Sequence, residues 1–504
     1  MLAFAFAQLV GLLRRILVAQ AFGVGAEMDA FIAANRVSET LFNLVAGGAL
    51  GSAFIPTFTG FLAKEDKKSA WKLASAIANW VFLVLSLLAA LAAFFAPQIV
   101  RHVLAPGFSA NPIQFTLTVN LLRIQLASAI LFGLSGLVMG ILNSHQVFLI
   151  PALTPSMYQL GMIFGVLVLS PSMGIYGLAW GVVIGALFHL LLQLPVLIKQ
   201  RGKYSLTLGF GDAAAREVIR LMGPRLLGVA VVQLNFWVNI WLASRMPEGS
   251  VAGIEYGFAL MLMAQVAIAQ SIATAAMPTF AAQYALGKLD DVRHSLAASL
   301  RGVTLLSVPA AVGLIILRVP LITLLYQRGE FDARSTQLVA WALLWYAIGL
   351  VGHSVMEILA RAFYALHDTK TPVLVGIGAM SLNVVFSVTF AALFTRIGWM
   401  PHGGLALANS LATALEMVGL MILMRKRLNG INGKSIARGF AQAAVAALGM
   451  GIALVWWQQA TATSATWVVA MGGIAFGGIV YLLGMLILKV PEIRQLKEMI
   501  QRRL

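Results

Sequence analysis

Residues 80–95 read Trp-Val-Phe-Leu-Val-Leu-Ser-Leu-Leu-Ala-Ala-Leu-Ala-Ala-Phe-Phe, and Ser86 is the one hydrophilic side chain among them. The run does not alternate apolar and polar residues, as a strand of a membrane β-barrel does with its period of two. A single bilayer crossing takes ~20 mostly apolar residues in helical form. The stretch therefore predicts a membrane-spanning α-helix, and similar runs recur along the chain.

The composition extends this prediction to the whole chain. Of 504 residues, 60% are apolar and 11% charged, and the mean hydropathy is +0.90. A soluble globular chain is about 45–50% apolar and about 25% charged, so the soluble classes are excluded. Cysteine is absent, which leaves no disulfide framework and no thiolate metal site; we expect no metal site at all.

We predict an all-α polytopic membrane protein with fourteen transmembrane helices, at 1–22, 29–62, 71–96, 113–142, 147–170, 174–199, 222–245, 251–284, 297–327, 334–366, 371–396, 402–425, 436–459 and 465–489. The first is interpreted as a retained span instead of a signal peptide, because Arg14-Arg15 interrupts the apolar run where a signal peptide would have its charges before it.

The charges are unequal, 35 Lys and Arg against 18 Asp and Glu, for a net charge of +17. In a soluble protein this excess would indicate nucleic acid. Here 25 of the 35 lie at one side of the predicted spans, in 64–72, 199–225, 288–301, 361–370, 425–438 and 489–503. By the positive-inside rule these connections and both termini are cytoplasmic, and no nucleic acid partner is expected.

The chain resembles itself at a shift of 221 to 227 residues. Pro56-Thr57-Phe58 recurs as Pro278-Thr279-Phe280, Pro151 as Pro372, and Gly177-Leu178-Ala179 as Gly404-Leu405-Ala406. Six spans in each copy make the two copies parallel in topology, which is a transporter plan: two lobes around a central cavity. We predict an N-terminal lobe at 1–199, a cytoplasmic linker at 200–221, a C-terminal lobe at 222–427, and two further helices with a basic tail at 428–504. Gly47, Gly48, Pro56 and Pro278 are candidate gating or bending positions.

Charges within the spans are the candidate site. A charge at the bilayer centre costs ~2.5–3.5 kcal/mol on insertion scales, so it faces a cavity or has a partner. Arg14 shares a helix face with Gly11, which favours a cavity position, whereas Arg15 points about 100° away. The alternative for Arg14 is a structural pair with an intramembrane acid. For Arg36 the cavity and the pairing interpretations stay equally open.

Other polar residues in the spans have structural alternatives too. Glu39, Glu357 and Glu416 could take part in proton coupling, although an intramembrane acid more often forms a structural pair. Asn235, Asn239 and Asn383 could bind a cation through carbonyl oxygens, although such amides more often bond across helices; Asn235 and Asn383 are the candidates we retain. His189 is expected to be an interhelical donor. The chain lacks HExxH, GxSxG and GxxxxGK[ST], so we expect no catalytic residues.

Motifs in order from the first to the twelfth span resemble the MurJ/MviN family. They are Gly11-Leu-Leu-Arg14, Phe22-Gly23, Asp29-Ala30-Phe31, Gly47-Gly48-Ala49-Leu50, Ala53-Phe54-Ile55-Pro56, Leu104-Ala105-Pro106-Gly107-Phe108, Gly329-Glu330-Phe331, Phe363-Tyr364-Ala365 with Asp368, Thr371-Pro372, Gly404-Leu405-Ala406 and Asn409-Ser410-Leu411.

The resemblance implies a flippase for lipid II, the polyprenyl-pyrophosphate-linked peptidoglycan precursor, working by alternating access in the bacterial inner membrane. Expected partners are the lipid-linked oligosaccharide, membrane lipids and cell-wall synthesis proteins. It implies no cofactor, and coupling to Na⁺, H⁺ or the membrane potential. Arginine suits bidentate phosphate contact. We predict that Arg14, Arg15 and Arg36 bind the substrate, together with Asp29 of the family motif.

The chain departs from the family pattern where the cavity is usually cationic, with Gln8, Phe42 and Ala259 at three such positions. Gly47 replaces a usual acid, and Arg15 stands where many members have one. Two alternatives follow: a flippase for another polyprenyl-linked glycan, or a non-transporting membrane scaffold derived from such a transporter.

Overall fold

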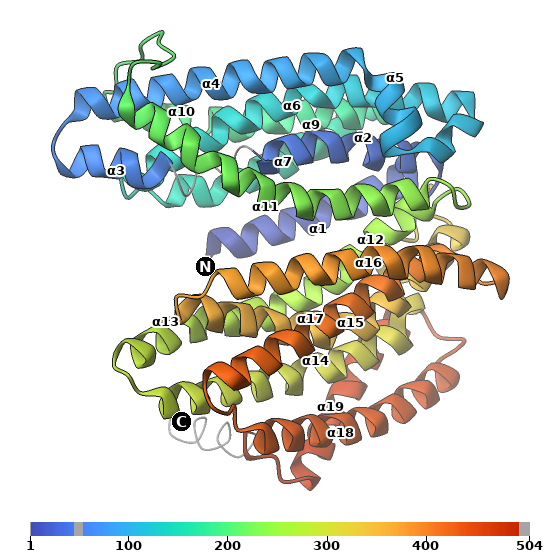
Figure 1. The fold of residues 1–504 in the computed structure, drawn as a ribbon. Helices are drawn as coiled ribbons and strands as arrows, with labels where there is room; N and C mark the ends of the chain where they lie inside the picture. Colours follow the sequence, from blue (N-terminus) through green and yellow to red (C-terminus); the bar gives the residue numbers. More distant parts are fainter. Residues whose placement is uncertain (1, 45–53, 493–504) are drawn as a thin grey trace. The chain divides into compact units, whose positions relative to one another are not determined.

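The structure is a computed structural model that describes residues 2–44 and 54–492, and all regular structure within those ranges is helical (Figure 1). Eleven helical stretches of the described residues are long and apolar enough to cross a membrane. They coincide with eleven of the predicted spans, which confirms the all-α polytopic class. The predicted spans 1–22, 29–62 and 222–245 correspond to other helices, so the total of fourteen stays a prediction.

The first compact unit comprises Met1–Val251 with Arg328–Phe331. In it α6 packs against α2, α4 and α9, and α7 packs against α1 and α9. Its helices are α1 (Leu2–Phe22), α2 (Ala26–Phe42), α3 (Ile55–Ala63), α4 (Lys67–Phe94), α5 (Ala96–Gln98), α6 (Pro112–Ser144), α7 (Leu149–Phe164), α8 (Ser170–Met173), α9 (Ile175–Leu191), α10 (Leu194–Lys199) and α11 (Ala213–Ala243).

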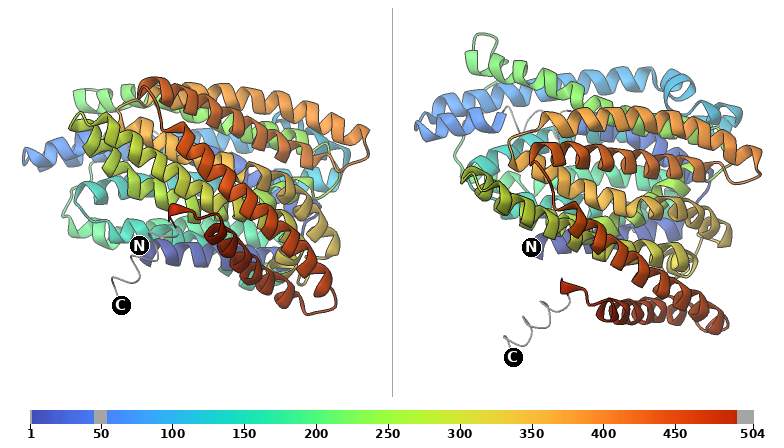
Figure 2. Two further views of the ribbon diagram at one scale, coloured as in Figure 1. Left: turned by 90° about the horizontal axis from the view of Figure 1, so that it is seen from below. Right: turned by 60° about the horizontal axis from the view of Figure 1, so that its bottom comes forward.

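The second unit comprises Ala252–Gln327 and Asp332–Leu504. In it α15 packs against α14 and α17, and α17 packs against α16. Figure 2 shows the last two helices, α18 and α19, running side by side. The helices are α12 (Ser250–Gln265), α13 (Ser271–Ala285), α14 (Leu289–Tyr326), α15 (Ala333–Ala365), α16 (Lys370–Arg396), α17 (His402–Arg427), α18 (Gly433–Ala460) and α19 (Gly473–Ile487).

A helix begins inside the predicted linker at 200–221. Helix α11 begins at Ala213, because the Asp212 carboxylate accepts a hydrogen bond from the Ala214 N–H at 3.0 Å and so caps the helix start. The predicted start of this helix at residue 222 is therefore wrong, whereas the cytoplasmic linker at 200–221 stays a prediction. The two compact units divide after Val251, whereas the predicted lobes divide near 222; the lobe boundaries and the cavity between lobes stay predictions.

The sequence repeat has a structural counterpart in each unit. Phe58 of α3 and Phe280 of α13 are both fully buried, each in the core of its own unit. Gly177 lies near the start of α9, where an added Cβ would meet the Ser170 backbone nitrogen at 2.4 Å. Gly404 lies near the start of α17, where it would meet the Phe390 carbonyl carbon at 2.6 Å. The repeated glycine thus allows the same close helix approach in both units.

Candidate functional site

Two family motifs meet at the turn between α1 and α2. Gly23 and Gly329 both have positive φ, +57° and +58°. A Cβ on Gly23 would lie 2.3 Å from the Glu330 carbonyl oxygen, and one on Gly329 would lie 2.4 Å from that of Gln20. The Glu330 N–H donates to the Gln20 carbonyl at 2.9 Å. Glycine is required at both positions because backbone touches backbone where L side chains are already strained.

Asp29 lies beside this turn, where two helix starts cap each other. Its buried carboxylate accepts a hydrogen bond from the Gly249 N–H at 2.7 Å, just before α12 begins. In return, the Glu248 carboxylate accepts from the N–H of Ala26, the first residue of α2, at 3.0 Å. Carboxylates are favoured at helix N-termini because of the exposed N–H groups and the helix dipole. This geometry gives Asp29 a positioning role, and its predicted substrate contact stays a prediction.

The Leu104–Phe108 motif packs against the end of α11. The Gly107 N–H donates to the Ser244 hydroxyl at 3.2 Å, and a Cβ on Gly107 would come within 2.0 Å of the Ser244 carbonyl oxygen. The Leu104–Phe108 motif therefore contacts a segment of unit 1 that lies more than a hundred residues further along the chain.

Arg14 lies on α1 and faces α7. Its Nη1 donates to the Met162 sulfur at 3.2 Å, a weak acceptor for a guanidinium. Gly11, one turn away, faces the Gln159 side chain of the same helix, so the two share a helix face as predicted. Arg15 is half-buried and forms no hydrogen bond or ion pair with any described residue.

Arg36 forms an ion pair within its own helix. Its Nη1 lies 2.9 Å from Glu39 Oε2, and the other Glu39 oxygen accepts from the Asn35 amide at 2.8 Å. The guanidinium also lies 4.8 Å from the centre of the Phe236 ring on α11, a favourable cation–π distance. The structure therefore shows the pairing interpretation of Arg36, whereas its cavity position stays a prediction.

A chain of rings starts at Phe42, where the family pattern is cationic. Phe132 of α6 lies 5.0 Å from Phe42, 5.0 Å from Tyr158 and 5.5 Å from His189, measured between ring centres. Tyr158 lies on α7, the same helix whose Met162 accepts from Arg14. The predicted cations and this aromatic chain therefore share one region of unit 1, which is our candidate site.

His189 belongs to a buried polar triad behind the rings. The Ser135 hydroxyl lies 2.6 Å from His189 Nδ1 and accepts from the Gln193 amide, also at 2.6 Å. The Ser135 hydroxyl therefore joins the His189 ring to the Gln193 amide. The contact joins α9 to α6, so the interhelical position of His189 is confirmed, whereas its role as the donor stays a prediction.

The predicted cation ligands already use their amide oxygens locally. Asn235 accepts from the Asn239 amide at 3.4 Å, and buried Asn383 accepts from the Ser387 hydroxyl at 3.1 Å. Within residues 2–44 and 54–492, no three His, Asp or Glu residues cluster as metal ligands would. Cation binding at Asn235 and Asn383 stays a prediction.

The remaining predicted positions divide between the units. Glu357 pairs with Arg361 at 3.1 Å, whereas Glu416 forms no ion pair with any described residue and lies beside Gly376. Pro56 occupies the first turn of α3, and Pro278 lies inside α13. Gly47 and Gly48 lie outside the described residues.

The fold defines the class: a polytopic helical membrane protein whose chain forms two compact units. The profile of the family described as lipid II flippase MurJ matches residues 18–474. The chain belongs to the MurJ family.

Named relatives cover nearly the whole chain. The lipid II flippase MurJ of Burkholderia cenocepacia is 31% identical over 83% of this chain and 81% of its own length. The probable lipid II flippase MurJ of Vibrio cholerae is 30% identical over 94% and 90%. The family resemblance deduced from the motifs is therefore confirmed.

Solved structures agree on the fold. A structure of lipid II flippase MurJ in an inward closed conformation superimposes with a TM-score of 0.83, at 25% identity, over 98% of this chain and 99% of that one. An inward-facing multidrug transporter of the MATE family and MOP superfamily gives 0.69 at 16% identity, over 84% of this chain and 94% of that one, which is a likeness of fold.

Sequence reasoning missed Glu248 and the partners of Phe42. Glu248 lies in a short connection, 222 residues from the N–H that it caps, and no local pattern indicates such a partner. Phe132 and Tyr158 look like ordinary apolar positions of a span. The one available signal was Phe42 itself, an aromatic residue at a position where the family pattern has a cation.

Proposed function

We propose that this chain flips lipid II across the bacterial inner membrane by alternating access, and so supplies peptidoglycan synthesis. The observation that carries the proposal is the membership of nearly the whole chain in a family whose named members are lipid II flippases. Both termini are cytoplasmic in this proposal, in keeping with the one-sided distribution of Lys and Arg.

Arg14 and Arg36 would bind the pyrophosphate. A guanidinium offers several N–H donors in a plane that matches phosphate oxygens, and Arg14 contacts a thioether that a phosphate outcompetes as an acceptor. Phe42 and Phe132 would form the apolar side of the same site. The protein's own chemistry in this cycle is binding and release, without a cofactor, and the cycle would be driven by the membrane potential or by a Na⁺ or H⁺ gradient.

Expression in a strain depleted of its own lipid II flippase tests the proposal. The wild-type chain should restore growth and precursor translocation, Arg14→Ala should abolish both, and Arg14→Lys should restore part. Arg123→Ala is the matched control, because Arg123 is an exposed arginine of α6 that donates to the Ala93 carbonyl at 3.1 Å.

A wild-type chain that reaches the membrane but restores neither growth nor translocation contradicts the proposal. The Phe42–Phe132 contact favours a second candidate, a flippase for another polyprenyl-linked glycan, since it replaces a phosphate-binding cation by an apolar surface. If the wild-type chain and Arg14→Ala both restore growth without restoring precursor translocation, the chain acts as a scaffold and not as a transporter.

A further inference from the structure

Successive turns of α1 and α7 meet in register beside Arg14. Gly11 faces the Gln159 side chain, and one turn later Arg14 donates to the Met162 sulfur at 3.2 Å. Because the residue numbers rise together along both helices, α1 and α7 run in the same direction at this contact. Three residues of an α-helix rise about 4.5 Å, so Gln159 lies one turn of α7 before the residue that Arg14 contacts.

The side-chain oxygen of Gln159 is an unused hydrogen-bond acceptor. Its Oε1 is buried and accepts no hydrogen bond from any described residue. A buried amide oxygen that accepts nothing costs free energy, and polar atoms inside proteins nearly always have a partner. Gly11 presents no side chain to this amide, and a Cβ added there would already lie 3.8 Å from Gln159 Nε2. The glycine therefore keeps the room beside the amide open.

An unused acceptor selects the part of the substrate that can meet it. Only a group with an N–H or an O–H can donate to Gln159 Oε1. The ionised pyrophosphate offers acceptor oxygens and the polyprenyl tail is hydrocarbon, so neither supplies a donor. The hydroxyl and amide groups of the glycan head do. The sugar joined to the pyrophosphate brings the nearest of these groups to a phosphate bound by Arg14.

We propose that Gln159 binds the first sugar of the polyprenyl-pyrophosphate-linked glycan, by accepting a hydrogen bond from one of its hydroxyl or amide groups while Arg14 binds the pyrophosphate. This inference rests on the proposed function and deepens it, because it divides the site into a phosphate part and a glycan part. Arg14 provides affinity for any polyprenyl pyrophosphate. Gln159 distinguishes a lipid that carries a sugar from one that does not, since a site with a buried acceptor rejects a ligand that lacks the donor.

The test compares two lipids that differ only in the glycan-peptide head, lipid II and undecaprenyl pyrophosphate. Each is titrated onto the purified full-length chain in detergent, and bound lipid is counted by native mass spectrometry. Gln159→Met keeps the length of the side chain and removes its polar atoms. It should weaken lipid II binding about fivefold, the value of one neutral hydrogen bond, and leave undecaprenyl pyrophosphate binding unchanged. Arg14→Ala should instead weaken the binding of both lipids.

Gly11→Leu is a second variant that leaves the Gln159 amide itself intact. A leucine side chain would occupy the room beside the amide, so the preference for lipid II over undecaprenyl pyrophosphate should again be lost. The thermal unfolding midpoint of each variant shows that it is folded.

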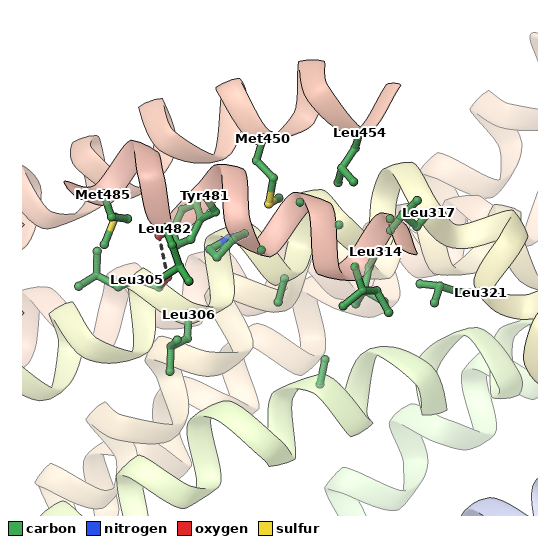
Figure 3. Close-up of a pocket in the computed structure, with 18 of the residues that line it drawn as sticks. Leu305, Leu306, Leu314, Leu317, Leu321, Met450, Leu454, Tyr481, Leu482 and Met485 are labelled. Atoms are coloured by element: carbon green, nitrogen blue, oxygen red, sulfur yellow. Dashed lines mark hydrogen bonds between the residues drawn. The ribbon is translucent and has the colours of Figure 1, made fainter. Parts of the chain in front are cut away.

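Gln442 of α18 provides the matched control, because its Oε1 is also buried and accepts no hydrogen bond from a described residue. Its amide donates to the Leu488 carbonyl at 3.0 Å. Further along α18, Met450 and Leu454 line an apolar cavity of about 600 Å³ (Figure 3), which offers nothing to a sugar. Gln442→Met should therefore bind both lipids as the wild type does.

Unchanged lipid II binding by Gln159→Met and Gly11→Leu overturns the inference. So does an equal loss for both lipids, since Gln159 would then act on the phosphate part of the site or on the fold. If the wild-type chain binds undecaprenyl pyrophosphate as tightly as lipid II, the glycan part of the site is absent, and only this inference fails. If the wild-type chain binds neither lipid, the proposed function itself is contradicted and this inference fails with it.

Discussion

Two arginines within predicted spans form ion pairs that differ in burial and in the distance along the chain between the partners. Arg36 pairs with Glu39 three residues along the same helix, with Nη1 2.9 Å from Oε2, and the Glu39 side chain is 43% exposed. Arg301 is only 9% exposed and holds both oxygens of Glu492, which lies 191 residues further along the chain.

The difference separates a pair that can open from a pair that holds helices together. Glu39 can release Arg36 by a rotamer change, because both residues stay on α2. Releasing Arg301 would leave a buried guanidinium without its carboxylate and would free the end of α19 from α14. The first arrangement suits a binding site and the second an architectural contact.

We expect the largest change in stability when the Arg301–Glu492 pair is broken. Glu492→Gln should lower the free energy of unfolding by about 2 kcal/mol, less than the ~3–5 kcal/mol of a fully buried pair, because Glu492 is 32% exposed. The double variant Arg301→Met with Glu492→Leu should regain most of the loss, since apolar replacements leave no unpaired charge. Thermal and denaturant unfolding of the purified chain would measure both.

The control for Glu492→Gln is an exposed ion pair on α14, the helix that carries Arg301. Asp290 pairs with Arg293 in the first turn of α14 and its side chain is 83% exposed. Asp290→Asn should change stability by less than about 0.5 kcal/mol. If Glu492→Gln is equally mild, the contrast between the two kinds of pair is wrong.

The same pair predicts a smaller, pH-dependent effect. The hydrogen bond from Arg301 lowers the pKa of Glu492 below its ordinary value of 4.5. A carboxyl group with a lowered folded-state pKa stabilises the fold above its ordinary pKa, and this stabilisation is lost as the pH falls through the folded-state value. The stability difference between wild type and Glu492→Gln should therefore be constant from pH 7 to about pH 5 and shrink below 4.5. A difference that grows on acidification would contradict this assignment.

The fold class was predictable because long apolar runs indicate membrane-spanning helices. Runs such as 80–95 predict helices, and eleven predicted spans match helices of the structure. The start of α11 was missed, because its first two turns contain Arg216 and Arg220 and resemble a polar linker. The cap from Asp212, and not hydrophobicity, sets that boundary.

Of the candidate site, only the charged residues could be predicted from the sequence. An intramembrane arginine stands out in sequence because it is costly, which identified Arg14 and Arg36. Its partners do not stand out when they are distant or apolar, as for Met162 beside Arg14 and Phe236 beside Arg36. The same limit applies to Arg301, which looks like one more basic residue of a cytoplasmic connection until Glu492 is placed beside it.

At the Arg36–Glu39 pair we expect the smallest change in stability. We expect the clearest change in transport there. Glu39→Gln should cost less than about 0.5 kcal/mol, as an ion pair within one helix does. It should nevertheless lower the KM for lipid II transport into or out of proteoliposomes, because Arg36 is then no longer shared with a carboxylate. Arg36→Met should raise that KM by about tenfold, the value of one charge-assisted phosphate contact.

Glu357→Gln is the matched control for this prediction. Glu357 also pairs within one helix, with Arg361 at 3.1 Å, and it belongs to the other compact unit. Its loss should leave the KM unchanged while costing about as little stability. If Glu357→Gln and Glu39→Gln shift the KM equally, the effect comes from removing any intramembrane charge, and Arg36 has no special place in substrate binding. If only Glu39→Gln shifts it, the release of Arg36 is part of the binding step.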